Sequence, residues 1–391
     1  MINDIEIENF RCFEHTKIEG FERVNLIGGK NNSGKTALLE AIAINQSPQP
    51  DMILFLTKLR DDSLHYSTSY PEKTWDALFF NNQTEKYAKV TIKSFGHQQV
   101  LLLSANLQLN SNFKVSEKDQ KSLKSNTVLE ALNYSQYLTI ELQADHLGID
   151  KYLLRMANSI GEGIKLDIEV LLKPMSILNK FSITQTIKSK YDFKEFISAS
   201  KIDLMIQYIS ASFRLNKIEI IKEYSNVELK NRGHHLINIL QRIDPKIQEI
   251  KIFSIREPIL YLKRENEQFL PISMFGDAIN RAIEIMVKIL NNESSIILID
   301  EIENGIHYTS HRDFWKALFE ISKELDVQIF ATTHSLEMIQ AFRDIGLNHY
   351  ADSGSYFTMT KHYKTSKIIG IKRELETLDY AIEHGKEVRG E

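Results

Sequence analysis

The stretch from Arg23 to Ile42 constrains the fold of this chain more than any other, because it matches a phosphate-binding pattern in the required context. Gly29, Gly34, Lys35 and Thr36 satisfy G-x-x-x-x-G-K-[ST]. The pattern follows an apolar, strand-like run and precedes a run of helix formers. A simple Gly/Asn turn would not explain both flanks. The sequence therefore predicts a P-loop.

The chemistry of a P-loop assigns a role to each of its residues. Its glycines let backbone N–H groups turn toward a polyphosphate, and the following helix N-terminus adds positive potential. We expect Lys35 to reach the β- and γ-phosphates and the Thr36 hydroxyl to bind Mg²⁺. The predicted ATP-binding residues of the loop are Gly29, Asn31, Asn32, Ser33, Gly34, Lys35 and Thr36.

Composition bounds the class of protein without identifying it. The chain has 391 residues, of which 42% are hydrophobic and 26% charged, as in an ordinary soluble globular protein. The formal net charge of -4 neither supports nor excludes DNA binding. Cys12 is the only cysteine, so no internal disulfide can form. No signal peptide or membrane-length apolar run is evident, and we expect a cytoplasmic protein.

The pattern along the chain predicts an α/β fold interrupted by a long insertion. Strands are expected in residues 2–28 and a hairpin in 87–108, whereas 46–86 and 109–127 lack regular patterning. In the C-terminal third, apolar strands alternate with amphipathic helices, which indicates a mainly parallel core sheet. We predict an N-terminal part of the core with the P-loop (1–45), an insertion with an antiparallel β lobe and an α/β or helical region (46–235), and a C-terminal part of the core (236–391).

Two further expectations concern the C-terminal part of the insertion and the histidine pair at its border. Residues 173–235 are rich in Lys and Ile and nearly free of Gly and Pro, which favours helices, although 205–213 could form a strand. His234 and His235 lie at the start of a predicted helix that ends near Ile243. Because no other histidine stands at a metal-ligand spacing from this pair, we interpret both as structural.

A second motif has the form of a Walker B strand. Four apolar residues, Ile296 to Ile299, precede Asp300 and Glu301. The carboxyl end of a strand is where open α/β sheets bind ligands. We expect Asp300 to hold Mg²⁺, directly or through water, and Glu301 to orient or deprotonate the attacking water. An acidic turn without function is the competing interpretation, which the P-loop in the same chain disfavours.

A histidine follows the next predicted strand. His334 ends the segment Ile329-Phe-Ala-Thr-Thr-His-Ser335, about thirty residues after Asp300. A histidine at such a position can hydrogen-bond the γ-phosphate or the attacking water. A lone histidine after a strand is more often structural, but the preceding Walker B strand favours a catalytic role here.

A third segment, Ser273 to Asp277, directly precedes the long predicted helix before the Walker B strand. Serine and glycine at a helix N-terminus can form an anion site, as Ser273 and Gly276 would here. The alternative is an ordinary helix cap by Ser273 or Asp277. The residues alone leave both interpretations open.

Together these motifs resemble the ABC-type ATPase heads of the RecF and SMC class. They resemble most closely the stand-alone AAA-like ATP-binding proteins related to overcoming-lysogenization-defect (OLD) nucleases. The resemblance covers about residues 1–45 and 235–391. It is carried by Asn9-Phe-Arg-Cys-Phe13, the P-loop, Ser273 to Asp277, Leu298 to Tyr308, Ala331 to Ser335 and the closing Ala381 to Gly390.

The resemblance implies a head that dimerises head to tail, with ATP between one subunit's P-loop and the other subunit's signature segment. Ser273, Gly276 and Asp277 would then face the γ-phosphate in trans. Arg11 would correspond to an N-terminal arginine that contacts the nucleotide. Glu303 and Asn304 would belong to the loop at the dimer interface.

The departures from the family pattern limit what it implies about activity. The signature reads Ser-Met-Phe-Gly-Asp rather than Ser-Gly-Gly, and no Q-loop glutamine can be placed. The 57 residues after His334 are too few for the Toprim domain of OLD nucleases. We therefore expect nuclease or toxin activity, if any, to come from a separate partner.

The sequence leaves three functions open. The first is a Mg²⁺-dependent ATPase whose ATP-driven dimerisation acts as a switch for DNA or an effector protein, in keeping with anti-phage defence. The second is a nucleotide-locked scaffold that holds a toxin or nuclease partner. The third is a RecF-like DNA repair clamp.

Overall fold

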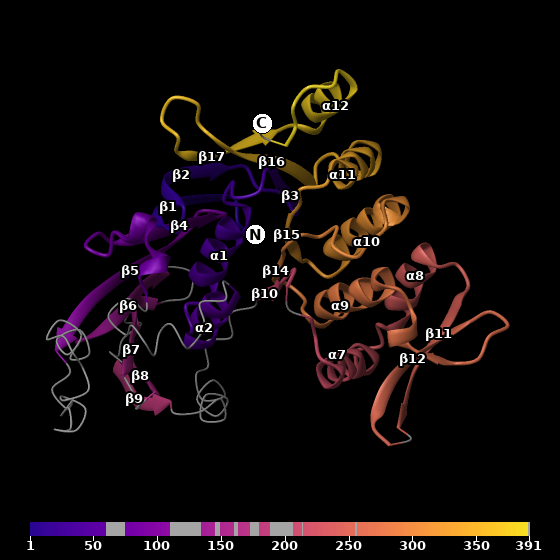
Figure 1. The fold of residues 1–391 in the computed structure, drawn as a ribbon, viewed down its shortest axis with the longest axis horizontal. Coiled ribbons are helices and arrows are strands. Elements are labelled where there is room, and N and C mark those ends of the chain that lie inside the picture. Colours follow the sequence, from indigo (N-terminus) through magenta and orange to yellow (C-terminus); the bar gives the residue numbers. More distant parts are fainter. Residues whose placement is uncertain are drawn as a thin grey trace, which may run out of the picture. The chain divides into compact units, whose positions relative to one another are not determined.

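The computed structural model describes residues 1–59, 75–109, 134–144, 149–159, 163–172, 180–187, 206–212, 214–254 and 256–389. These residues belong to two compact units (Figure 1). The core unit comprises Met1–Ile2, Glu19–Leu39 and Met205–Glu391, and the β unit comprises Asn3–Ile18 and Glu40–Leu204.

A six-stranded sheet forms the centre of the core unit, with strand order β10-β14-β15-β3-β16-β17. The first five strands of this order pair in parallel, and only the edge strand β17 is antiparallel. The predicted mainly parallel core sheet is therefore confirmed. The strands are β3 (Val24–Gly29), β10 (Ile206–Ile209), β14 (Ile296–Ile299), β15 (Gln328–Thr332), β16 (Gly354–Lys361) and β17 (Ile368–Arg373).

Helices bury their apolar faces against the strands of this unit. In α9, Ile279, Ile283, Met286 and Leu290 recur at helical spacing and are all buried. Figure 1 shows α9, α10 and α11 in a row alongside the strands of the sheet. The helices are α7 (Lys217–Leu229), α8 (Gly233–Ile243), α9 (Asp277–Asn291), α10 (His311–Glu324), α11 (Leu336–His349) and α12 (Leu375–Glu383).

A smaller sheet completes the core unit. It consists of β11 (Ile247–Ser254), β12 (Pro258–Arg264) and β13 (Leu270–Pro271), paired antiparallel in that order. Single 3-10 turns follow at η5 (Ile272–Met274) and η6 (Tyr308–Ser310). The short turn η5 leads directly from this sheet into α9, so the small sheet carries the segment Ser273 to Asp277.

The β unit contains an eight-stranded sheet in the order β2-β1-β4-β5-β6-β7-β8-β9. Its pairings from β1 through β9 are antiparallel, which confirms the predicted antiparallel lobe. The strands are β1 (Asp4–Phe10), β2 (Phe13–Glu19), β4 (Ala88–Ser94), β5 (His97–Leu109), β6 (Tyr134–Ala144), β7 (Ile149–Ser159), β8 (Gly163–Leu172) and β9 (Lys180–Ile187).

Helix α1 (Lys35–Gln46) begins in the core unit and continues into the β unit. Helix α2 (Pro50–Leu59) and the 3-10 turns η2 (Asp76–Leu78) and η3 (Phe80–Asn82) follow it. The sequence predicted irregular structure over 46–86, and this prediction is wrong at α2. Pro50 begins this helix rather than interrupting one, because a proline in the first turn loses no backbone hydrogen bond.

The border of the core unit differs from the sequence-based border at residue 235. The structural division falls at Leu204 and Met205, because β10 pairs in parallel with the Walker B strand β14. This strand lies within the possible strand at 205–213, and α8 confirms the predicted helix that starts at the two histidines. Part of the predicted helical stretch is instead strand β9. The loop predicted over 109–127 falls, apart from Leu109, outside the described residues.

Of the helices in the described part of the chain, none combines the length and apolarity needed to cross a bilayer.

Candidate nucleotide-binding site

Three neighbouring parallel strands bring the predicted motifs together. Strand β15 lies between β3 and β14, with Thr332 opposite Ile27 and Ala331 opposite Ile299. The P-loop follows β3, Asp300 follows β14, and His334 follows β15. Because parallel strands end at the same edge, segments from distant parts of the sequence meet at one edge of the core sheet, and open α/β sheets bind ligands at such edges.

The backbone of the P-loop needs its glycines. Gly29 has φ +153°, and a Cβ there would lie 2.5 Å from the Ser33 hydroxyl and 2.6 Å from the Met359 carbonyl oxygen. Gly34 also has a positive φ, as does Asn32. Asn31 and Asn32 are exposed, whereas Ser33 is buried without a hydrogen bond from its hydroxyl to any described residue. The loop is therefore tightly folded around its own backbone.

Lys35 is buried within this loop. Its Nζ donates hydrogen bonds to the carbonyl oxygens of Gly29, at 2.7 Å, and Lys30, at 2.8 Å. Burial lowers the pKa of this ammonium, and the neighbouring carboxylates, Asp300 first, act in the opposite direction. A buried cation beside carbonyl oxygens and carboxylates can exchange these contacts for phosphate oxygens.

Thr36 and Asp300 meet although 264 positions separate them in the sequence. The Thr36 hydroxyl donates to Asp300 Oδ1 at 3.2 Å, and the Thr332 hydroxyl donates to the same oxygen at 2.6 Å. All of these groups are oxygens, which are the ligands Mg²⁺ prefers, together with water and substrate phosphates. The residues at this edge therefore fit a magnesium ion that is completed by a nucleotide.

Glu301 has an unusual backbone conformation for a residue with a side chain. Its φ is +48°, in the left-handed region that costs energy for non-glycine residues. Its backbone N–H donates to Thr332 Oγ1 at 2.9 Å, so the hydroxyl that holds Asp300 also holds the next residue. Thr332 thus fixes both carboxylate residues of the Walker B motif.

His334 pairs with a second carboxylate at this edge. Its Nδ1 lies 3.0 Å from Glu303 Oε1, and its backbone N–H donates to the same oxygen at 2.8 Å. The imidazole is half exposed, whereas Glu303 is 10% exposed. Glu303 therefore orients His334 within a single chain, a contact that the sequence did not indicate because it assigned Glu303 to the dimer interface.

The segment Ser273 to Asp277 stands apart from these contacts. Gly276 is the N-cap of α9, and a Cβ added there would meet nothing within 4 Å. Ser273, Gly276 and Asp277 are exposed, and no side chain caps α9. The ordinary-cap alternative for Ser273 or Asp277 is therefore wrong. Among the described residues, neither Ser273 nor Gly276 is hydrogen-bonded to the P-loop.

The backbone of this segment is nevertheless held in one conformation. The Asn280 side-chain amide donates to the carbonyl oxygens of Ile272, Phe275 and Gly276, at 3.2, 2.9 and 3.2 Å. The turn is therefore rigid while its outer surface remains open.

Arg11 lies in the β unit. Its Nε is 2.9 Å from Glu40 Oε2, and its Nη1 donates to the carbonyl oxygen of Ala77 at 2.9 Å. The arginine side chain is 7% exposed and that of Glu40 is fully buried. This ion pair explains why an arginine stands here, and the nucleotide contact expected for Arg11 stays a prediction.

Arg281 is a residue at this site that the sequence did not single out. Its guanidinium is fully buried and donates to the backbone oxygen of Asp300, at 3.3 Å, and of Ser210, at 3.1 Å. Glu284 neutralises it at 2.8 Å. Burial lowers the pKa of Arg281, while Glu284 raises it. The sequence feature that could have identified Arg281 is its position, because it is a charged residue within the apolar pattern of α9.

Comparison with known proteins decides the family. A model of the family described as AAA ATPase domain matches residues 1–339. The chain belongs to this AAA ATPase domain family. The family is one of ATPases, and the P-loop motif of this chain agrees with an ATP-hydrolysing P-loop protein.

Curated relatives of this AAA ATPase extend over most of its length. An ATP/GTP phosphatase of Helicobacter pylori is 25% identical over 361 residues, covering 87% of each chain. The DNA replication and repair protein RecF of Streptococcus agalactiae is 22% identical over 380 residues, covering 88% of this chain and 94% of RecF.

Solved structures with a similar arrangement are heads of SMC proteins. An SMC head bound to the C-terminal winged-helix domain of ScpA is 11% identical, with a TM-score of 0.47, and the match covers 97% of this AAA ATPase and 99% of that chain. The SMC head domain of Thermotoga maritima is 12% identical with a TM-score of 0.39, at 95% and 99% coverage.

Proposed function

We propose that this AAA ATPase hydrolyses ATP with Mg²⁺ and that ATP-driven dimerisation makes it a switch for DNA or a separate effector protein. The observation that carries the catalytic part is the contact between the P-loop hydroxyl of Thr36 and the Walker B carboxylate of Asp300. A hydroxyl and a carboxylate so placed form half of a metal site that substrate phosphates complete.

Each residue of the edge has one task in this proposal. Lys35 and the loop N–H groups bind the phosphates, and Thr36 and Asp300 hold Mg²⁺, which would neutralise charge on the phosphates. Glu301 orients or deprotonates the attacking water. His334, oriented by Glu303, contacts the γ-phosphate or that water.

Dimerisation is supported by the exposed signature segment. Ser273 and Gly276 are exposed and belong to a turn whose backbone carbonyl oxygens are held by the Asn280 amide. A helix N-terminus without a side-chain cap leaves N–H groups available to an anion. In the proposed dimer, this turn meets the γ-phosphate bound by the second copy.

Substitution of Glu301 by glutamine tests the mechanism. We expect E301Q to lose at least about 100-fold in ATP turnover, as is usual on removal of a general base, while retaining ATP binding. Light scattering coupled to gel filtration should show more dimer in ATP for E301Q than for the parent. E376Q, on the exposed face of α12, is the control and should hydrolyse ATP normally. Equal turnover by E301Q and the parent would refute the catalytic assignment.

A RecF-like DNA clamp is the second candidate, because the similarity to RecF spans 88% of this chain. It would require DNA as the direct partner, and its binding to duplex DNA should need ATP and weaken steeply with salt. Purified E301Q with ATP, titrated with a fluorescent duplex at two salt concentrations, distinguishes this clamp from an effector switch. Binding would assign DNA as the partner.

An effector switch related to OLD nucleases, with a role in anti-phage defence, and a nucleotide-locked scaffold both require a separate protein partner. They differ in turnover. A switch cycles through hydrolysis, whereas a scaffold retains ATP unhydrolysed. Single-turnover measurement of bound ATP in the parent protein therefore separates these two forms of the proposal.

A further inference from the structure

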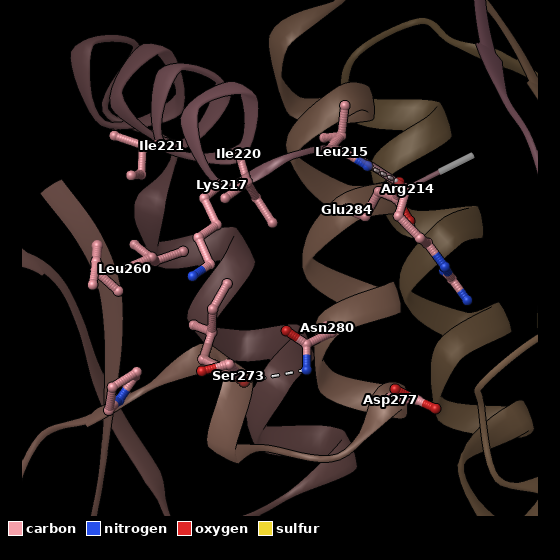
Figure 2. Close-up of a pocket in the computed structure, with 13 residues that line it drawn as sticks. Arg214, Leu215, Lys217, Ile220, Ile221, Leu260, Ser273, Asp277, Asn280 and Glu284 are labelled. Carbon is pink, nitrogen blue, oxygen red and sulfur yellow. Dashed lines mark hydrogen bonds and ion pairs between the residues drawn. The ribbon is translucent and has the colours of Figure 1, made fainter. Parts of the chain in front are cut away.

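A cavity lies in the core unit beside the signature segment (Figure 2). Its volume is about 340 Å³, and it is bounded by the start of α7, strand β12, turn η5 and the first turns of α9. Neither the P-loop nor the Walker B carboxylates contribute to its lining. The lining residues are Arg214, Leu215, Lys217, Ile220, Ile221, Ile259, Leu260, Pro271, Ile272, Ser273, Asp277, Asn280 and Glu284.

The apolar part of this cavity is aliphatic throughout. More than half of its lining consists of leucine, isoleucine and proline, without any aromatic ring. Leu260 and Ile220 are buried members of the wall. Small-molecule sites are mostly apolar, occupy about 300 to 1,000 Å³ and carry a few placed polar groups. The cavity has the size and lining of a site for an alkyl group.

Lys217 supplies a positive charge at this apolar wall. It is the first residue of α7 and is exposed, and Figure 2 shows its side chain extending from α7 toward the side of the cavity where Leu260 and Ser273 lie. Within the described ranges, its amino group has no hydrogen bond or ion pair. A cation at a helix N-terminus is unfavourable because that end of the helix dipole is also positive. An arriving anion would relieve both charges.

The other charged side chains that line the cavity are Arg214, Glu284 and Asp277, and they either form ion pairs or point away from Lys217. Glu284 accepts from Arg214 at 3.1 Å, from Arg281 at 2.8 Å and from the backbone of Leu215 at 2.9 Å. Figure 2 shows Asp277 pointing away from Lys217. The charge that remains for a ligand is therefore positive.

The geometry points to a binding site for an aliphatic carboxylate, with the alkyl group among Ile220, Leu260 and Ile272 and the carboxylate on Lys217. A free alkyl acid and a polypeptide that ends in leucine both carry this chemistry. Because Ser273 and Asp277 belong to the lining, an occupant would touch the signature segment. This consequence for nucleotide-driven dimerisation rests on the proposed function, whereas ligand binding itself does not.

Methyl NMR of the whole protein without nucleotide tests the site directly. Sodium octanoate and the tripeptide Gly-Gly-Leu, as its free acid, are the two probes. We expect at least one to shift the methyl signals of Ile220, Ile259 and Ile272. Octylammonium and the C-terminal amide of the same tripeptide should bind about tenfold or more weakly, because neither carries the negative charge that would form an ion pair with Lys217.

Charge reversal at Lys217 separates this site from nonspecific apolar binding. K217E preserves the capping box of α7, formed by Asn216 and Glu219, and places an acid where the helix dipole favours one. It should reverse the preference, so that octylammonium binds better than octanoate. K222E, on an exposed position of the same helix outside the lining, should leave the preference unchanged.

The outcomes identify the source of the ligand or reject the site. Binding of octanoate alone assigns a free acid, binding of the tripeptide alone assigns a chain terminus, and binding of both supports the shared chemistry. No methyl shift with either acid, or the same preference in K217E as in the parent, would overturn the proposal. Because nucleotide is absent, these results do not depend on whether the chain dimerises with ATP.

Discussion

The P-loop edge and the signature segment belong to the same core unit but differ in how far their side chains are engaged. At the P-loop edge, the Thr36, Asp300 and Thr332 side chains hydrogen-bond one another, and Lys35 is buried against its own loop. The signature turn is fixed through its backbone, whereas the Ser273 side chain is exposed. Side chains of the chain itself organise the P-loop edge, whereas the signature turn combines a fixed backbone with exposed side chains.

This difference has an energetic basis. Buried polar groups must find partners inside the fold, because each unsatisfied group costs about 1–3 kcal/mol. Exposed groups such as Ser273 are satisfied by water and can change partner at little cost. In the proposed function, the P-loop edge therefore binds nucleotide in a single copy, and the signature turn contacts the second copy afterwards.

The largest effect expected at the P-loop edge is that of Lys35→Met. Loss of the charge-assisted bonds to phosphate should weaken ATP binding about 100-fold, at about 1.5–3 kcal/mol for each bond. Titration with a fluorescent ATP analogue measures this change. Lys30→Met, at an exposed position of the same loop, is the control and should bind nearly as the parent does. Unchanged affinity in K35M would remove the P-loop assignment.

An intermediate effect is expected at the signature turn. Ser273→Ala removes an exposed hydroxyl, so ATP affinity of the monomer and the melting temperature should both stay the same. Turnover should fall about tenfold if this hydroxyl contacts phosphate in the dimer, a loss of about 1.4 kcal/mol. S254A, at the exposed end of β11, provides the matched control. Normal turnover by S273A at all protein concentrations would argue against a contact in trans.

The smallest effect on turnover is expected for Thr332→Val. This change leaves Asp300 Oδ1 without one donor and the Glu301 N–H without its acceptor, so unfolding should require about 1–3 kcal/mol less free energy. Turnover should fall about fivefold, for about 1 kcal/mol of lost positioning. Urea unfolding and steady-state kinetics measure both quantities.

Thr91→Val is the control for that experiment. Thr91 is buried in β4, and its hydroxyl has no hydrogen bond with any described residue. An isosteric change there should leave turnover unaltered and cost little stability. If T332V and T91V behaved alike, Thr332 would be an ordinary buried threonine rather than a residue that positions the two carboxylates.

Prediction from sequence worked where function demands a fixed local pattern. The segment Gly29 to Thr36 could be recognised because its fold requires a glycine at position 29. A Cβ there would lie 2.5 Å from the Ser33 hydroxyl, so the sequence has to show this glycine. Asp300 could be recognised because it ends an apolar strand. Thr332 looked like one more polar residue at a strand tip, and its two hydrogen bonds depend on β15 lying between β3 and β14. Strand order is a long-range property that no local pattern contains.

Arg281 and Glu303 show the same limit with charged side chains. A sequence suggests that a charged residue is solvated, whereas Arg281 is fully buried by Ser210, Glu284 and the backbone of Asp300. Glu303 was expected at an interface, and its contact with His334 lies within one chain. Glu284 lies in the same helix as Arg281, but the backbone oxygens of Ser210 and Asp300, and the His334 partner of Glu303, come from other segments of the chain.

By itself, the sequence determined that this chain would build a P-loop and a Walker B strand in a mainly parallel α/β core, because those features rest on short-range sterics and apolar periodicity. Only the tertiary structure decided which side chains meet: Thr36 with Asp300, Thr332 with both Walker B residues, and Lys217 with an aliphatic cavity beside the signature turn. These contacts depend on strand order and helix packing, which bring together groups that lie far apart along the chain.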